Sequence, residues 1–354
     1  MDSIGLDLHK RESQLCLGHE DDTRSEYRIP TTAARFTALL GNRPRARILL
    51  EASTESEWVA THLETLGHEV IVADPNYAPM YAHRSRRTKT DKRDARALMD
   101  ACRTGTYRPA HRLSADRRHV RAELAVRDAL VRTRVRYIAL AKTLVRRDGL
   151  RVAGSTSRLV ARRIQELDLP VALRAELAPL FAVLAPLTAE ITAADDRIEA
   201  ASAADAVVQR LMTAPAIGPV TASAFVATID TIERFPSAHQ LEAYLGLVPS
   251  ERSSGEKRQL GRITKAGNGR VRWLLVEAGW HLLRSKKPET AALRAWALPI
   301  AARRGKRVAA VALARRLAGI LYAMWRDQVD YDATQLRRRP TRPVAASLTP
   351  TPTP

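Results

Sequence analysis

The sequence predicts an α/β domain at the N-terminus, followed by a coiled-coil pair of helices and a mainly α-helical C-terminal domain. In residues 1–80, short apolar runs alternate with polar turns and helix-like stretches. Beyond residue 114, apolar residues recur at spacings of three and four, which is the period of a helix. We place the boundaries at residues 1–108, 109–212, 213–330 and 331–354, the last being an Arg/Pro/Thr-rich tail expected to be disordered.

The N-terminal elements follow from local pattern. Three strand-like runs separated by short polar turns predict an antiparallel meander, and two further apolar runs are each preceded by a helix. A helix from a threonine cap to Leu40 and a helix over 56–66 fill the gaps, and another helix is expected from about Asn76. The predicted strands are residues 3–8, 13–17, 25–29, 47–51 and 69–73. The order β-β-β-α-β-α-β-α is that of the ribonuclease-H-like nuclease fold.

Four carboxylates fall at informative points of this order. Asp7 lies inside the first strand, Glu51 closes the fourth, and Asp91 and Asp94 stand three apart at a helix start, on one helix face. A buried unpaired charge is costly, and binding a hard cation such as Mg²⁺ offsets that cost. Two such ions can hold the attacking and leaving oxygens of a phosphodiester displacement. Taken singly, the paired aspartates could be a solvated helix cap and Asp7 a strand-end residue.

Positive charge is concentrated in two blocks of the chain. The formal charge is +20, divided as −5 in residues 1–80, +17 in 81–163, −7 in 164–248 and +15 in 249–354. Clustered arginine predicts a polyanionic partner, because it neutralises phosphates and releases counterions. A merely soluble basic protein is the alternative. The second block also supplies four candidate nucleic-acid contacts just before the paired aspartates: Arg84, Arg86, Arg87 and Lys89.

Two long helices are expected in the middle of the chain. Residues 114–148 contain no proline or glycine and combine a narrow apolar stripe with many arginines. A second stripe runs over 187–212, interrupted only by the polar Asp205. The two helices could pack within one chain or form a dimerising coil. The arginine face could bind nucleic acid or be solvated.

The C-terminal part contains glycine-rich turns beside basic residues. Residues 213–222 resemble a helix-hairpin-helix turn, in which Gly218 would offer backbone N–H groups to a phosphate and Ala216 stands where a glycine is usual. Residues 245–255 lead into residues 261–268, and this part of the chain combines serines and glycines with basic side chains suited to a phosphate backbone: Arg252, Lys257, Arg258, Arg262 and Lys265. A serine here could attack phosphorus, although a flexible loop is the alternative and no neighbouring histidine explains its activation. Helices are expected over 269–284, 288–304 and 306–328.

The sequence also argues against several classes of protein. There is no run of about 18 uncharged apolar residues, so we expect no membrane span. A charged N-terminus argues against an exported protein. Cys16 and Cys102 are the only cysteines, which makes a disulfide scaffold or a cysteine zinc site improbable.

Together these motifs resemble the DEDD transposases of bacterial insertion sequences, a family that includes the Piv-type invertases. The resemblance covers about residues 3–328. Its anchors in this chain are residues 4–10, 51–53, 89–91, 94–95, 217–219, 246–249, 253–255 and 263–268.

The resemblance implies a RuvC-like domain joined through a coiled coil to a transposase domain. It matches the four acids to metal ligands and Ser254 to a nucleophilic serine, with Ser253 as the adjacent alternative. Family members resemble RNA-guided recombinases, so the implied partners are donor and target double-stranded DNA, a structured guide (bridge) RNA and further copies of the chain, as a dimer or tetramer. The implied location is the bacterial cytoplasm at the nucleoid, without a membrane.

In that reading, the serine attacks a DNA phosphodiester and a 3′-hydroxyl of another strand resolves the phosphoserine link. Two other functions stay open at this point. One is a RuvC-like junction endonuclease that uses the acids alone. The other is a non-catalytic nucleic-acid-binding protein descended from such an enzyme.

Overall fold

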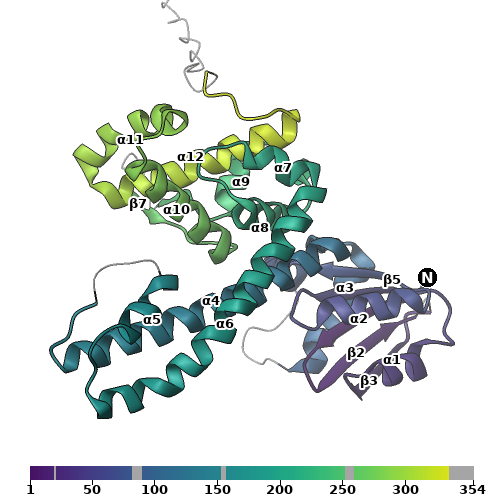
Figure 1. The fold of residues 1–354 in the computed structure, drawn as a ribbon. Helices are drawn as coiled ribbons and strands as arrows, with labels where there is room; N and C mark the ends of the chain where they lie inside the picture. Colours follow the sequence, from purple (N-terminus) through teal and green to yellow (C-terminus); the bar gives the residue numbers. More distant parts are fainter. Residues whose placement is uncertain (20, 82–89, 153–156, 252–258, 335–354) are drawn as a thin grey trace, which may run out of the picture. The chain divides into compact units, whose positions relative to one another are not determined.

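A computed structural model describes residues 1–19, 21–81, 90–152, 157–251 and 259–334 (Figure 1). The chain divides into two compact units, Met1–Leu113 and Ser114–Pro354. The first unit is an α/β domain built on one sheet, and the described part of the second is mostly helical. The expected change from α/β to helical structure is therefore confirmed.

A five-stranded sheet forms the centre of the first unit. Its strands are β1 (Ser3–Leu8), β2 (Glu12–Gly18), β3 (Arg24–Pro30), β4 (Arg47–Glu51) and β5 (Glu69–Ala73). The order across the sheet is β3-β2-β1-β4-β5, with β1, β2 and β3 antiparallel and β4 parallel to both β1 and β5. The meander and the apolar interior strand at residues 47–51 are confirmed.

Each face of this sheet is covered by helices. One face packs against α1 (Ala33–Leu40) and α2 (Ser56–Thr65), and its apolar side chains are at most 4% exposed: Ile4, Leu6, Leu15, Leu17, Ile48, Leu50 and Val72. The opposite face carries α3 (Asp91–Thr104), which contacts β1, β2 and β4. Thr32 caps α1 by accepting a hydrogen bond from the backbone N–H of Arg35, as a threonine cap predicts.

The helix expected from about Asn76 is wrong. The structure has only a 3-10 turn, η1 (Ala78–Tyr81), before residues 82–89 leave the described part of the chain. Pro79 lies inside this turn and has no N–H with which to continue a helix. The Asp74 carboxylate also accepts hydrogen bonds from the backbone and side-chain amides of Asn76, which favours a turn over a helix.

Gly5 lets α3 approach β1 unusually closely. A Cβ placed on Gly5 would lie 2.1 Å from the backbone oxygen of Ala95 and 2.2 Å from the backbone nitrogen of Met99. Both atoms belong to α3, and only a glycine leaves room for backbone at this distance. The backbone of β1 therefore packs directly against the backbone of α3, the helix that carries Asp91 and Asp94.

The second unit is built from long and short helices around a large apolar core, and a smaller apolar cluster joins α5 to parts of α4 and α6. Its helices are α4 (Ala115–Arg147), α5 (Ser157–Gln165), α6 (Val171–Ala204), α7 (Ala206–Met212), α8 (Pro219–Ile229), η2 (Ile232–Arg234), α9 (Ala238–Tyr244), α10 (Gly269–Arg284), η3 (Pro288–Thr290), α11 (Ala291–Arg304) and α12 (Lys306–Asp327). A two-stranded hairpin, β6 (Pro249–Glu251) and β7 (Leu260–Ile263), precedes α10. The three helices expected after residue 268 are present.

Asp205 divides the second apolar stripe into two helices. The stripe over 187–212 predicts one continuous helix, but α6 ends at Ala204 and α7 begins at Ala206. The Asp205 carboxylate accepts hydrogen bonds from the backbone N–H groups of Val207 and Val208, so it caps α7. The single polar residue of the stripe is thus the position where the helix stops. The α4 and α6 helices pack against each other.

Two helices of this unit, α6 and α12, are long and apolar enough to cross a membrane by length and composition alone. The most apolar window of α12 is 56% buried in the protein, and that of α6 is 22% buried. This criterion is weak, because a core helix of a soluble protein also meets it.

Candidate metal centre

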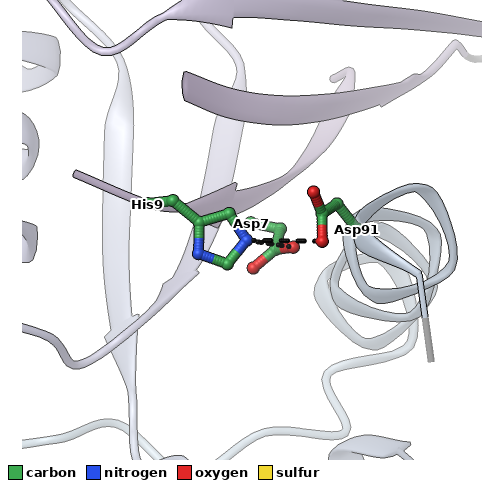
Figure 2. Close-up of side chains that lie close together, drawn as sticks. All are labelled: Asp7, His9 and Asp91. Carbon is green, nitrogen blue, oxygen red and sulfur yellow. Dashed lines mark ion pairs between the residues drawn. The ribbon is translucent and has the colours of Figure 1, made fainter. Parts of the chain in front are cut away.

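Three side chains converge in the first unit: one from β1, one from the residue directly after β1, and one from α3 (Figure 2). The Nε2 atom of His9 lies 3.3 Å from the Oδ2 atom of Asp7 and 3.5 Å from the Oδ1 atom of Asp91. One ligand atom from each residue lies within 4.8 Å of the other two. An ion placed among them could contact all three residues.

Strand alternation and a helix start explain this convergence. Gly5, Asp7 and His9 are two residues apart, so the side-chain direction that brings Gly5 onto α3 also directs Asp7 toward that helix. Asp91 is the first residue of α3, where the helix dipole favours a carboxylate. Thr90 precedes it as the cap and accepts a hydrogen bond from the backbone N–H of Arg93.

The other two predicted acids flank this group without belonging to it. In the parallel register, Gly5 pairs with Leu49. Two residues further along, Asp7 and Glu51 therefore point to the same face of the sheet from neighbouring strands, which lie about 4.8 Å apart. Asp94 is in the first turn of α3. Counted over the whole residue, Asp94 is only 6% exposed, compared with 8% for Asp7. The structure thus brings Asp7 and Asp91 into one cluster, and it places Glu51 and Asp94 on the surrounding elements.

His9 belongs to the cluster but was not predicted as a site residue from the sequence. Its side chain is 53% exposed, so it lies on the open side of the cluster, whereas the Asp7 side chain is 11% exposed. The alternation of Gly5, Asp7 and His9 contained the signal, because the three positions share one face. An imidazole beside two carboxylates suits Mn²⁺ and Zn²⁺ as well as Mg²⁺.

The two cysteines of the first unit do not compete for a metal. Burial raises the pKa of the Cys16 thiol, and it raises the pKa of the Cys102 thiol to about 11. Both thiols are therefore protonated at neutral pH, and a thiolate is the form that binds a metal. The candidate metal ligands in the described part of this unit are therefore carboxylate oxygens and an imidazole nitrogen.

In the second unit, two glycine-containing motifs that are far apart in the sequence fold against each other. A Cβ on Gly246 would lie 2.4 Å from the backbone nitrogen of Ala266, and a Cβ on Gly267 would lie 1.9 Å from the backbone oxygen of Tyr244. Both glycines also have positive φ, 67° and 64°. The Arg272 guanidinium then donates hydrogen bonds to the backbone oxygens of Leu245 and Ala266, which ties the two motifs to α10.

The basic residues beside these motifs are accessible where the structure describes them. Arg262 in β7 and Lys265 just after it are both exposed. Gly218 caps α8 with an extended backbone, and Ala216 adopts a positive φ of 65°, which alanine rarely does. The backbone strain at Ala216 occurs at the position where this type of turn usually has a glycine. A phosphate-binding role for the turn stays a prediction.

Several candidate residues lie outside the described part of the chain. They are Arg84, Arg86, Arg87, Lys89, Arg252, Ser253, Ser254, Lys257 and Arg258. The expected disordered tail from residue 335 also lies outside it. The roles given to these residues remain predictions from the sequence.

Comparisons with known proteins agree on one family. Residues 4–147 match a model of DEDD transposases of the IS110 type, and residues 208–294 match a model described as transposase, IS116/IS110/IS902 family. A probable family 20 transposase of Pseudomonas aeruginosa is 30% identical over 330 residues, covering 91% of this chain and 96% of that protein. The transposase for insertion sequence element IS1111A of Coxiella burnetii is 29% identical over 340 residues, covering 93% of this chain and 90% of that protein.

Proposed function

Because this chain belongs to the IS116/IS110/IS902 family of insertion-sequence transposases, we propose that it cuts and rejoins DNA with a serine nucleophile and a carboxylate-bound metal ion. The observation that carries the proposal is the meeting of Asp7 and Asp91 on β1 and α3, inside the region that matches the DEDD model. The family resemblance expected from the sequence is confirmed.

The first unit has the arrangement of a RuvC-like domain. Its strand order is β3-β2-β1-β4-β5, with an antiparallel meander followed by two parallel strands. The acid-bearing strand β1 is the central one, and helix α3 covers its acidic face. These features support a ribonuclease-H-like nuclease core.

The donor set fits a divalent cation. Two carboxylates and an imidazole lie within 4.8 Å of one another, and Glu51 and Asp94 can add carboxylate oxygens from the neighbouring strand and helix. Oxygen-rich sites of this kind take Mg²⁺, which we propose as the resident ion. When bound, the ion polarises a phosphodiester and stabilises charge on its oxygens. Buried Asp7 and Asp94 hold the ligand positions, while exposed His9 and Asp91 face the solvent from which DNA arrives.

The proposed chemistry proceeds through Ser254, with Ser253 as the alternative. The serine oxygen forms a bond to phosphorus, and the bond from phosphorus to the 3′-oxygen breaks and leaves a free 3′-hydroxyl. A 3′-hydroxyl of another strand then attacks the phosphoserine and releases the serine. The bond energy is kept in the covalent link, so rejoining needs no ATP. We assign Arg262 and Lys265 to binding of the DNA backbone, and their exposure supports this role.

We further propose the partners. Blocks of +17 and +15 favour nucleic acid, and we assign them to donor DNA, target DNA and a structured guide RNA encoded by the element. The protein would act as a dimer or tetramer in the bacterial cytoplasm at the nucleoid, with parts of different subunits meeting at one site.

The decisive experiment compares Asp7→Asn, Ser254→Ala and Ser253→Ala in a DNA-cleavage assay with Mg²⁺, with mass spectrometry of any covalent adduct. We expect Asp7→Asn to abolish cleavage, and one serine variant to abolish both cleavage and a phosphoserine adduct. Asp100→Asn is the matched control, because Asp100 lies on the same α3 helix and pairs with Arg24. Cleavage that survives both serine changes but not Asp7→Asn would replace the transposition chemistry with hydrolysis by a junction endonuclease.

Guidance by RNA has a separate test. Sequencing of the nucleic acid that copurifies with the protein should give one discrete RNA from non-coding DNA flanking its gene. A random sample of cellular RNA would contradict guidance and leave the cleavage chemistry untouched. DNA rearrangement that continues in an Asp91→Asn, Asp94→Asn double variant would instead make the acids structural.

A further inference from the structure

A basic groove runs between α4 and the start of α10 in the second unit, and we name it the α4–α10 groove. Its volume is about 690 Å³, within the range of about 300–1,000 Å³ that ligand sites occupy. Its lining combines four arginines and one aspartate with apolar groups, namely Arg127, Asp128, Val131, Arg132, Val135, Arg136, Ala139, Gly269, Arg270 and Trp273. This mixture of guanidinium and apolar surface is unlike either a packed core or a simple solvated face.

Trp273 gives the groove an exposed aromatic surface. The residue is 51% exposed, although a large aromatic side chain is normally more buried than this. The Arg270 guanidinium lies over its ring, 4.6 Å from the centroid, in a cation–π contact. Val135 on the facing helix α4 is 52% exposed. A flat aromatic ring held from one side by an arginine is a surface on which a nucleobase can stack.

Asp128 holds two of the arginines in place. Its Oδ1 atom is 2.6 Å from Nη1 of Arg270, and its Oδ2 atom is 2.7 Å from Nη2 of Arg132. The Asp128 side chain is only 12% exposed, so this largely buried carboxylate holds the two guanidinium groups in position. Asp195 pairs with Arg127, so two carboxylates face the four guanidinium groups and the lining keeps a net positive charge, which suits a phosphate backbone.

A second hollow continues the groove along α4. Its volume is about 410 Å³, and it shares Asp128, Arg132 and Arg270 with the first hollow. It reaches Arg121 on α4 and Asn268, which caps α10. From residue 121 to residue 139, α4 extends about 27 Å at 1.5 Å per residue. The combined surface is long enough to follow several nucleotides of an extended strand.

We propose that the α4–α10 groove binds a single-stranded segment of nucleic acid, with one base stacked on Trp273 and the backbone along the α4 arginines. This inference rests on the proposed function, because it gives the RNA or unpaired DNA of that reaction a place on the protein. A duplex is disfavoured, because its bases are already stacked on one another and cannot cover the Trp273 ring.

The test measures binding of fluorescent 20-nucleotide strands to the full-length protein by anisotropy, in EDTA so that no cleavage occurs. The strands are oligo(dT), oligo(U) and an oligo(dT) strand with consecutive abasic positions. Trp273→Ala is compared with Trp273→Phe, which keeps an aromatic ring, and with Trp273→Leu, which keeps only apolar bulk. Trp58→Ala is the matched control, since Trp58 is also exposed, at 37%, but lies beside Glu55 in the acidic block of residues 1–80.

We expect Trp273→Ala and Trp273→Leu to weaken binding of a base-bearing strand about 5- to 100-fold, the loss of one stacked base. Trp273→Phe should stay within about threefold, and Trp58→Ala within about twofold of the wild type. On the abasic strand, Trp273→Ala should bind like the wild type. A larger loss on oligo(U) identifies RNA as the occupant, and a larger loss on oligo(dT) identifies DNA.

The proposal is overturned if Trp273→Leu binds base-bearing strands as the wild type does, or if its loss is equal on the abasic strand. Equal losses would mean that the change acts through the fold or the charge of the groove. The EDTA in this assay prevents metal-dependent cleavage, so strand binding is measured apart from the reaction. If the Trp273 variants contradict base stacking, the cleavage proposal therefore still stands. If the cleavage assay contradicts the proposed reaction, the strand-binding results still decide whether a base stacks on Trp273.

Discussion

Substitution of Gly5 by alanine should separate α3 from β1 and disable the metal cluster. The new Cβ would lie 2.1 Å and 2.2 Å from two backbone atoms of α3, where ordinary contact begins near 3.4 Å. The helix must therefore retreat by about 1 Å or more, because backbone atoms cannot rotate aside. Overpacking of this kind costs about 3 kcal/mol, the upper end of the usual range, which corresponds to a melting temperature roughly 10 °C lower for the first unit.

The same displacement moves Asp91 away from Asp7. Metal ligands tolerate errors of only about 0.2 Å, so the affinity for Mn²⁺, used as a calorimetric probe, should fall at least about tenfold. Thermal unfolding and isothermal titration of the full-length protein measure the two effects.

Gly18→Ala is the control for this prediction. Its Cβ would also meet α3 but only the Sδ atom of Met99, at 2.6 Å, and a methionine side chain can move. It should therefore cost less than about 1 kcal/mol and leave metal affinity unchanged. If Gly5→Ala is as stable as Gly18→Ala and binds Mn²⁺ like the wild type, the close packing of α3 on β1 does not position the acids.

Three further changes test other parts of the structure. Burial raises the pKa of Asp205, but the Arg117 ion pair and the cap of α7 outweigh it and hold the pKa below its usual value. The contribution of the Asp205 carboxylate to the free energy of unfolding is therefore present above about pH 4 and lost as the pH falls. Urea unfolding should show Asp205→Asn to be about 1 kcal/mol less stable than the wild type at pH 7, with the difference shrinking toward pH 3. A difference that stays constant with pH would contradict the assignment. Ala216→Gly should raise stability by about 1 kcal/mol, because alanine is strained at a φ of 65°, and a lower urea midpoint would mean that Ala216 is not strained. His9→Ala should weaken Mn²⁺ binding about tenfold while changing Mg²⁺ binding less, and titrations in which neither affinity moves would remove His9 from the ligand set.

Most of the first unit follows from local sequence pattern. Short apolar runs between polar turns locate the five strands, and a threonine cap locates the start of α1. The presence of Asp7 in β1 and of Asp91 at the start of α3 also follows from the sequence. His9 was missed because it follows the strand, and its proximity to Asp91 depends on how closely α3 approaches.

The helix boundary at Asp205 and the role of Trp273 depend on tertiary contacts that the local sequence pattern does not encode. An apolar stripe of constant spacing continues through Asp205, but the Arg117 ion pair and the cap turn that residue into a helix boundary. The exposed ring of Trp273 reads in the sequence as one more apolar residue of α10, and its role depends on α4 lying opposite. Long-range packing decided both outcomes.

The most direct measurement of the central claim is anomalous diffraction from crystals of the full-length protein soaked in Mn²⁺. We expect a peak among the carboxylates of Asp7 and Asp91, with metal–oxygen distances of about 2.2 Å, and its loss in Asp7→Asn crystals. A manganese ion bound elsewhere, with this cluster empty at saturating metal, would contradict it.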